Sequence, residues 1–476
     1  MDLKKSKRLI LLLAVIYWVF AIGIYTLGYN QFRYSKGMSD APGTTYVVGE
    51  IVDGMELSQT VKAPSNVLNA VEIFAGTFDR TNTGSLTLTL ENSAGQIAGQ
   101  KTVSLSEIKN NQYTCFAFDE EIALSKGETL VLRLTTEGCS AGNAITIYAG
   151  GVLQGENAPG AYALNGESTT GTLCVRLSGY SERAFYQIYW IAVVGAFLIL
   201  AAYVVWCFRQ ARRGKSNMVV SLCTVYSRYT FLIKQLVSRD FKTKYKRSAL
   251  GMAWSFVNPL LTMTVQYVVF STLFKSDIPN YPVYLLTGIV FFSFFNEALT
   301  LGMTSITGNA ALIKKVYMPK YIYPVSRVLS SLINFAFALM PLFLVVIFTG
   351  TPFQPAMLLL IFDIVCLLAF VTGMTLLLTT AMTFFQDTQF LWSVVSMMWQ
   401  YVTPVFYPES IIPAKFLPIY RLNPMYQFIT FARTCIIDGV SPGPSAYLRC
   451  ILTAGIVLLL GVGVFRKQQN KFVLYV

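Results

Sequence analysis

Residues 239–274 read RDFKTKYKRSALGMAWSFVNPLLTMTVQYVVFSTLF, and this stretch decides the class of the protein. Residues 239–248 are strongly basic, whereas residues 249–274 contain no charged side chain. The apolar run is long enough to cross a bilayer as a helix, which takes about 20 residues. The stretch therefore predicts a membrane protein in which a basic segment at the membrane surface leads directly into a span.

A row of hydrophobic side chains precedes the apolar run at a spacing of four residues. Its members are Ile233, Val237, Phe241 and Tyr245, and lysines fall on other sides of the same helix. A helix with one apolar face and one cationic face can lie in the membrane interface, against anionic lipid headgroups. The basic flank of an ordinary span is the alternative, but the four-residue period favours the interfacial helix. The candidate interface residues are Arg239, Asp240, Lys242, Tyr245 and Arg247.

The composition places the protein in a membrane and excludes several kinds of chemistry. Only 13% of the 476 residues are charged and 54% are hydrophobic, whereas a soluble domain is about a quarter charged. The net charge is +13, and the basic residues cluster beside apolar runs. The positive-inside rule places such clusters in the cytoplasm, so the charge does not indicate nucleic-acid binding. The chain has no histidine, which excludes histidine-based acid–base catalysis, Ser–His–Asp triads and histidine metal ligands. The eight cysteines form no CxxC pair, and a disulfide stays open among Cys115, Cys139 and Cys174.

Residues 9–28 and 184–208 predict two membrane spans that flank a different kind of sequence. The first is interpreted as an uncleaved anchor rather than a signal peptide, because its apolar run is long and no small-residue cleavage pattern follows it. Between the spans, apolar and polar residues alternate, as in Leu86, Leu88 and Leu90, and Gly, Asn, Ser and Asp mark the turns. This pattern predicts an antiparallel β-sandwich. Acidic residues outnumber basic ones there, unlike in the cytoplasmic clusters, so we expect the sandwich to be extracytoplasmic.

The sequence leaves the role of the sandwich open. All six tryptophans lie in predicted membrane segments, although sugar-binding platforms usually rely on aromatic faces and on tryptophan above all. The aromatic residues that remain as sugar contacts are Tyr46, Tyr113, Tyr148 and Tyr162. Packing within the strands is the simpler explanation for each tyrosine. A spacer, or a contact surface for a neighbouring protein, is at least as good a role for the domain.

The second half of the chain predicts further spans at residues 281–303, 327–349, 356–384, 390–406 and 446–465. The first two are joined by a short, basic loop that is cytoplasmic by parity. A proline-rich stretch after the span ending at residue 406 is too apolar for a soluble loop, and it predicts a re-entrant pair of short helices. The fragment GKS at 214–216 lacks the first glycine of a phosphate-binding loop. We therefore expect any ATP-driven function to need a partner chain.

Four short motifs in this half occur together. They are an Arg-Asp pair followed by KYKRSALGMAW and NPLL, the loop pattern N-x-x-L-I-K-K-V-x-x-P, the T-P-x-x-Y-P run at 403–408, and the Asn-Pro pair at 423–424. As a set they resemble the type-2 ABC exporter permeases that move lipid-linked polysaccharides, among them the O-antigen and teichoic-acid exporters. The resemblance covers roughly residues 225–470, and Gln386 stands where the family usually has an arginine.

The resemblance implies partners and a docking element. In the family, the short basic loop is a coupling helix that seats in a groove of a separate ABC ATPase, which binds ATP and magnesium, so this chain itself is expected to hold no cofactor. The residues that match the loop are Asn309, Leu312, Ile313, Lys314, Lys315, Val316 and Pro319. The other expected partners are a second copy of the permease in a homodimer, a lipid-linked polysaccharide substrate and membrane lipids.

Aromatic residues recur at a spacing of seven near the end of the second half. Residues seven apart lie on one face of a helix, and aromatic faces suit the apolar sides of sugar rings. Packing or lipid contact is the alternative explanation for such a stripe. The candidate polymer pathway consists of Phe385, Trp392, Trp399, Phe406 and Tyr407.

Two acidic residues, Glu297 and Asp363, lie well inside predicted spans of this half. Charged side chains within a membrane usually face the bundle interior and are paired or hydrated. We expect both carboxylates to pair with neighbouring helices, although Glu297 could instead accept hydrogen bonds from sugar hydroxyls.

The sequence as a whole predicts an α-helical polytopic membrane protein of about eight spanning helices, with an inserted extracytoplasmic all-β sandwich. The expected parts are a cytoplasmic tail and first span (1–28), the sandwich (29–183), the second span (184–208), a linker with the interface helix (209–248) and a six-helix permease domain (249–470). Both termini are expected in the cytoplasm. The expected function is a non-enzymatic permease subunit that exports a lipid-linked polysaccharide. An exporter of drugs or simple lipids is the runner-up, and a membrane-embedded glycosyl- or acyltransferase or a ligand sensor is less favoured.

Overall fold

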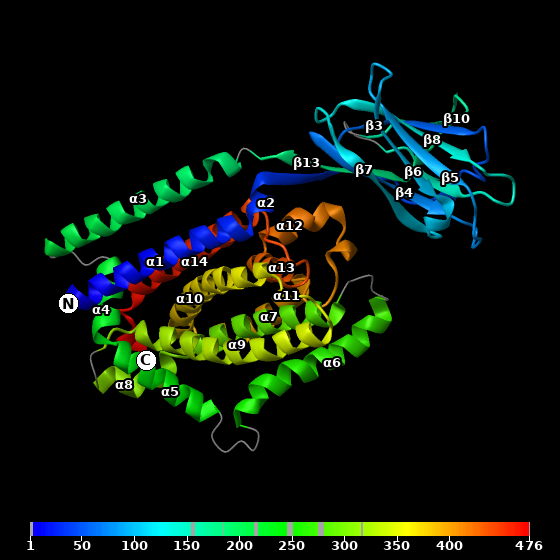
Figure 1. The fold of residues 1–476 in the computed structure, drawn as a ribbon. Helices are drawn as coiled ribbons and strands as arrows, with labels where there is room; N and C mark the ends of the chain where they lie inside the picture. The colour runs from blue at the N-terminus through cyan, green and yellow to red at the C-terminus, as the bar shows by residue number, and fades with distance from the viewer. Residues whose placement is uncertain are drawn as a thin grey trace. The chain divides into compact units, whose positions relative to one another are not determined.

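The computed structural model describes residues 3–153, 158–183, 185–213, 218–244, 251–274, 280–315 and 318–475. The chain divides into two compact units, which are Phe32–Tyr189 and the combination of Met1–Gln31 with Trp190–Val476. The first unit is built of strands and the second of helices (Figure 1). The predicted combination of a helical membrane protein with an inserted all-β domain is confirmed.

The first unit is a sandwich of two antiparallel sheets. The seven-stranded sheet runs β1 (Tyr34–Met38), β13 (Val175–Glu182), β4 (Val67–Gly76), β9 (Thr146–Gly150) and β12 (Thr172–Leu173), with β2 (Tyr46–Val47) on β9 and β7 (Gln112–Ala123) on β4. The six-stranded sheet runs β11 (Glu167–Ser168), β10 (Tyr162–Leu164), β3 (Glu56–Lys62), β8 (Thr129–Glu137), β5 (Ser85–Glu91) and β6 (Ile97–Ser104).

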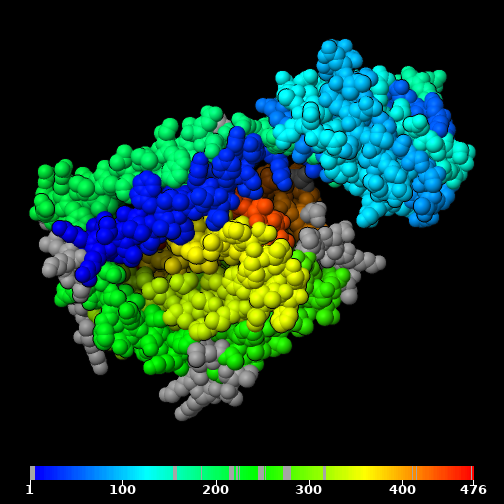
Figure 2. All heavy atoms as spheres, viewed as in Figure 1, coloured from blue at the N-terminus to red at the C-terminus, as the bar shows by residue number. Residues whose placement is uncertain are grey.

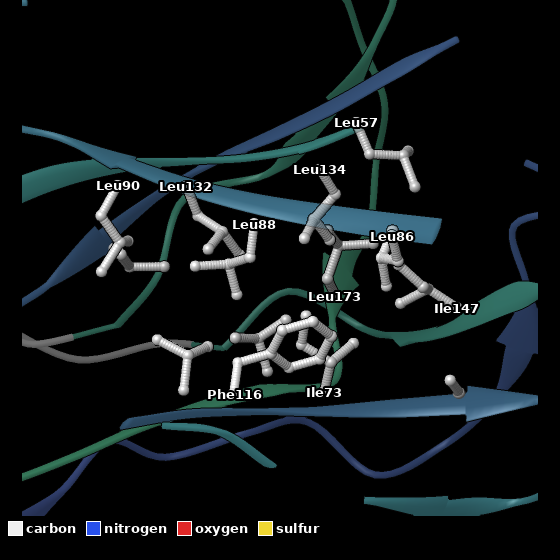
Figure 3. Close-up of a cluster of buried hydrophobic side chains, with 14 of the residues drawn as sticks. Leu57, Ile73, Leu86, Leu88, Leu90, Phe116, Leu132, Leu134, Ile147 and Leu173 are labelled. Carbon is white, nitrogen blue, oxygen red and sulfur yellow. The ribbon is translucent and has the colours of Figure 1, made fainter. Parts of the chain in front are cut away.

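The alternation seen in the sequence is what closes the core of this sandwich. On β5, Leu86, Leu88 and Leu90 are fully buried, and the threonines between them face outwards. These leucines lie opposite Ile73 of β4 and Phe116 of β7 (Figure 3). Burial of apolar surface stabilises the sandwich by about 25 cal/mol per Å² and is the main contribution that holds the two sheets together. The three cysteines of the sandwich are all free, so the disulfide that the sequence left open does not form here.

The second unit contains the helices that a membrane would require. The long ones are α1 (Leu3–Leu27), α3 (Phe185–Arg212), α6 (Trp254–Phe274), α7 (Tyr281–Met303), α9 (Ile322–Phe348), α10 (Leu360–Phe384) and α14 (Pro444–Gln468). Shorter ones are α2 (Tyr29–Arg33), α4 (Met218–Arg228), α5 (Thr230–Lys244), α8 (Ala310–Lys315), α11 (Thr388–Val402), α12 (Leu417–Leu422), α13 (Pro424–Ile436) and α15 (Phe472–Tyr475). Within the described part of the chain, six helices are both long and apolar enough to cross a membrane. They are α1, α3, α7, α9, α10 with the turn before it, and α14.

Helix α7 lies at the centre of this unit, with α9 and α10 packed beside it, and α14 packs on α10. Most of the α7 side chains are buried, among them Phe291 and Phe295. Helices α10 and α14 touch backbone to backbone at Gly373 and Gly461, where a Cβ atom on Gly461 would come within 2.2 Å of the Gly373 carbonyl oxygen. Only glycine fits at such a contact. Helices α1 and α3 instead lie on the outside of the unit (Figure 2) and expose long apolar side chains such as Leu12 and Ile199.

The span predicted at residues 390–406 differs in the structure. Helix α11 ends at Val402 and has 15 residues, which gives a length of about 22 Å against the roughly 30 Å of a hydrocarbon core. Pro404 and Pro408 follow at once, and proline cannot continue a helix because it lacks the amide hydrogen. The predicted re-entrant pair then corresponds to α12 and α13, which meet at Asn423.

Candidate functional site

Two helices of the second unit carry polar stripes that face a common cavity. The α7 stripe is Ser293, Asn296, Glu297 and Thr300, and the α9 stripe is Arg327, Ser330, Ser331 and Asn334. Both follow the spacing i, i+3, i+4, i+7, which places four residues on one side of a helix. With the exception of Ser331, these residues line a cavity of about 810 Å³ together with the end of α5 and with Gly308 and Asn309. A second cavity of about 330 Å³ shares several of its lining residues and extends towards α6.

Two groups of charges hold α5 against this cavity. The buried carboxylate of Asp240 lies 3.1 Å from a guanidinium nitrogen of its neighbour Arg239 and 3.1 Å from one of Arg327 on α9. Lys244 Nζ lies 2.8 Å from Glu297 Oε1 on α7. Asn334 of α9 donates a hydrogen bond of 2.6 Å to the same oxygen. The interhelical pairing predicted for Glu297 is confirmed.

The same prediction is wrong for Asp363. This residue is fully buried in α10, and within the described part of the chain neither carboxylate oxygen has a hydrogen-bond partner. Its surroundings explain the difference, since α13 and α14 bring the thiols of Cys435 and Cys450 near it rather than a base.

The predicted interface helix is α5, and its apolar stripe turns towards protein. Leu236 and Asp240 are buried, and the ring of Phe241 stacks on Phe337 of α9 with 5.9 Å between centroids. Lys242 is exposed on another side of the helix. Two of the candidate interface residues, Tyr245 and Arg247, lie outside the described residues.

The predicted coupling segment consists of a 3₁₀ turn (Thr307–Asn309) and the short helix α8. Leu312 and Ile313 pack against a cluster that contains Tyr323, Phe465 and Phe472, whereas Lys314 is exposed. The apolar side chains thus anchor the segment, and Lys314 lies exposed on another side of it. Pro319 begins the way back to α9, while Val316 and the Lys315 side chain lie outside the described residues.

Neighbouring contacts fix both ends of this segment. The Asn309 amide donates to the carbonyl of Ser305 at 2.7 Å. Lys320 Nζ donates to the carbonyl of Gln469 at 2.5 Å, and burial lowers the pKa of the Lys320 ammonium. Because Gly308 and Asn309 also line the large cavity, a movement of the coupling segment reaches the cavity wall directly.

The aromatic stripe does not form one open face. Phe385 and Phe406 lie outside helix α11, and Phe385 is exposed while Phe406 is buried against Phe270, with 5.6 Å between ring centroids. Trp392 is 5% exposed and meets Phe295 of α7 at 5.9 Å. The prediction that these rings face a common pathway is wrong for this chain, because prolines end the helix before position 406.

The remaining members of the stripe also make contacts within the protein. Trp399 contacts Phe295 at 5.1 Å, and its indole nitrogen donates to Asn423 Oδ1 at 2.8 Å. The Tyr407 hydroxyl donates to the carbonyl of Tyr401 at 2.8 Å. Other α11 residues are exposed, among them Phe390, Leu391, Val394, Met398 and Tyr401.

A buried arginine organises the segment after α11. Arg433 of α13 donates to the carbonyls of Pro404 at 2.7 Å and Val405 at 2.9 Å, and to that of Tyr284 on α7 at 3.0 Å. Its guanidinium also lies 3.3 Å from the centroid of the Tyr284 ring. Pro404 and Val405 lie outside any regular helix, so their buried carbonyls need a donor that the helix hydrogen bonds do not supply, and the Arg433 guanidinium provides it.

Comparison with known proteins identifies the family. Residues 231–437 match the family model of the ABC-2 type transporter. Over 244 residues the chain is 30% identical to the O-antigen export system permease protein RfbA of Klebsiella pneumoniae, a match that covers 51% of this chain and 93% of the relative. The chain belongs to the ABC-2 type transporter family. Further relatives of this transporter are RfbA of Myxococcus xanthus, at 29% identity over 251 residues and 95% of its length, and the polysialic acid transport protein KpsM of Escherichia coli, at 20% over 244 residues and 93%.

Sequence reasoning missed two features of this ABC-2 transporter. The polar stripes on α7 and α9 could have been found, since their spacing is visible within otherwise apolar runs. The role of Arg433 could not, because its partners lie 28 and 149 residues away along the chain.

We expect Asp240→Asn to loosen α5 from α9. The change removes the charge that faces Arg239 and Arg327. It also puts an amide N–H donor in place of a buried carboxylate oxygen, and a buried donor without a partner costs about 1–3 kcal/mol. The measurement is the thermal melting of the purified transporter in one detergent. Lys242→Gln is the matched control, because Lys242 lies on the same helix and is exposed. Equal melting temperatures for Asp240→Asn and the wild type would contradict a role for this ion pair.

Proposed function

We propose that this chain is the permease subunit of an ATP-driven exporter that moves a lipid-linked polysaccharide across the cytoplasmic membrane. The observation that carries the proposal is the 30% identity to an O-antigen export permease over 93% of that relative's length. The predicted coupling segment supports it too, because Lys314 on this segment is exposed.

The energy comes from a separate ABC ATPase that binds ATP and magnesium and docks on the coupling segment. Because Asn309 belongs both to this segment and to the cavity wall, closure of the ATPase changes the distance between α5, α7 and α9. The serine, threonine and asparagine side chains of the cavity offer donors and acceptors suited to the polar part of the substrate.

The assembly that we propose is a homodimer in which residues 249–470 of two copies surround the path of the polymer. Both termini lie in the cytoplasm and the sandwich lies outside. Membrane lipids cover the exposed apolar side chains of α1 and α3. This topology agrees with the basic clusters at both ends of the chain, which the positive-inside rule assigns to the cytoplasm.

Crosslinking to the ATPase tests the proposal. In a variant without native cysteines, we expect a cysteine at Lys314 to crosslink to the ATPase and to do so differently with and without ATP. A cysteine at Phe348 is the matched control, since this residue is highly exposed at the opposite end of α9. A complex that hydrolyses ATP and exports polymer without any crosslink from position 314 would contradict docking at this segment.

A further inference from the structure

The sandwich lies outside the part of the chain that matches the family, and the outer face of its seven-stranded sheet carries an unusual group of side chains. On β4 the odd-numbered residues Val71 and Ile73 enter the core, so Glu72 and Phe74 point outwards. The strand register places Tyr113 of β7 beside Phe74, and Arg176 of β13 beside Glu72.

The rings on this face hold one another at steep angles. Phe74 meets Tyr113 with 4.9 Å between centroids and an interplanar angle of 70°, and it meets Tyr148 of β9 at 5.1 Å and 76°. The guanidinium of Arg176 lies 4.1 Å from the centroid of the Tyr113 ring. The Tyr148 hydroxyl donates to Asn111 Oδ1 at 2.7 Å. All the rings are half-buried, so each keeps part of its surface open.

Two of the four tyrosines that the sequence left as sugar contacts therefore meet on one surface, and the other two do not. Tyr162 is buried. The Tyr46 hydroxyl lies over Gly171, where an added Cβ atom would approach it to 1.7 Å. Tyr113 and Tyr148 share a face with charged residues of both signs, and this combination is what separates them from ordinary packed strand residues.

The charges on this face favour an uncharged ligand. Glu72 and Arg176 carry opposite charges on adjacent strands, so the surface has no net attraction for an anionic polymer. Aromatic faces complement the apolar C–H side of a sugar ring. A guanidinium, a carboxylate and the Asn111 amide supply the donors and acceptors that ring hydroxyls need.

We propose that this tyrosine platform, formed by Glu72, Phe74, Tyr113, Tyr148 and Arg176, binds an uncharged saccharide segment of the exported polymer. The inference rests on the proposed function, since it takes the polymer from that function as its ligand. It gives the sandwich a role in holding the glycan rather than in spacing the chain from the membrane.

Binding of surface polysaccharide, purified from the cells in which this protein is native, tests the platform. The full-length protein is immobilised in detergent, and the polysaccharide is passed over it. We expect wild-type protein to bind and Tyr113→Ala to weaken the apparent affinity by about tenfold or more, the scale of a central contact residue. Tyr113→Phe keeps the ring and should stay close to wild type.

The matched control is Phe118→Ala, which removes a ring from the same strand on the side that packs against the core. It should lower the melting temperature without weakening polysaccharide binding. The platform is refuted by wild-type protein that does not bind the polysaccharide, by unchanged binding in Tyr113→Ala, or by equal losses in Tyr113→Ala and Phe118→Ala. The crosslink from position 314 is measured on the same preparations. Its presence without polysaccharide binding refutes the platform alone, and its absence from an active complex contradicts the docking proposal instead.

Discussion

Replacing Arg433 by methionine should destabilise the protein by about 2–6 kcal/mol, because two buried carbonyls outside regular helices lose their donor at about 1–3 kcal/mol each. Methionine fills much of the same volume but cannot donate a hydrogen bond, so the carbonyls of Tyr284, Pro404 and Val405 lose the donor that Arg433 supplies. Water cannot easily replace it, since Arg433 is only 8% exposed. The expected result is a large drop in melting temperature of the purified protein, together with loss of polymer export.

Two comparisons make this result specific. Arg421→Met on α12 is the matched control, because its side chain is 55% exposed and its nearest carboxylate lies 3.9 Å away, so we expect almost no change. Arg433→Lys should fail to restore stability, because an ammonium group cannot reproduce the planar geometry of several donors. If Arg433→Met melts like Arg421→Met, the carbonyls after α11 are satisfied by something other than this side chain.

Trp392→Ala should destabilise the protein by about 3–5 kcal/mol as well, the usual cost of removing a large aromatic side chain from a core. The ring packs between α11 and α7, with Phe295 on one side and Trp399 at 6.4 Å. A residue that served only as a surface for a moving polymer would reduce export and leave melting unchanged. Here we expect export and melting temperature to fall together.

The matched control on the same helix is Phe390→Ala. Phe390 is 71% exposed, so its removal leaves no cavity and should leave the melting temperature near the wild-type value. Normal melting combined with lost export in Trp392→Ala would return this residue to the polymer pathway.

The elements that were predicted well are those with a regular hydrophobic pattern in the sequence. The sandwich follows from the alternation of strands such as β5, and α7, α9, α10 and α14 follow from their apolar runs. The seven-residue spacing of the aromatic stripe was misleading, because it assumed one continuous helix through Pro404. A local pattern reports which face a residue occupies only as long as the element continues.

The candidate site shows the same limit. The pairing of Glu297 was predictable, since a carboxylate within a membrane needs a partner, but its partners Lys244 and Asn334 come from two other helices. Asp363 satisfied the same reasoning and has no such partner among the described residues. The choice between the two outcomes depends on which neighbours the fold brings near, and a sequence pattern does not contain that information.

The glycine contact between α10 and α14 has a mechanical consequence. The backbone of Val457 and Leu458 on α14 lies 2.5–2.6 Å from the position that a Cβ atom on Gly373 would take, so a slide of α10 along α14 would press a larger α10 residue against that backbone. Shear between these helices is therefore blocked, and the pair moves as one rigid body. The hinges of a transport cycle must then lie elsewhere, and the ion pairs between α5, α7 and α9 are contacts that can break and re-form without repacking a core.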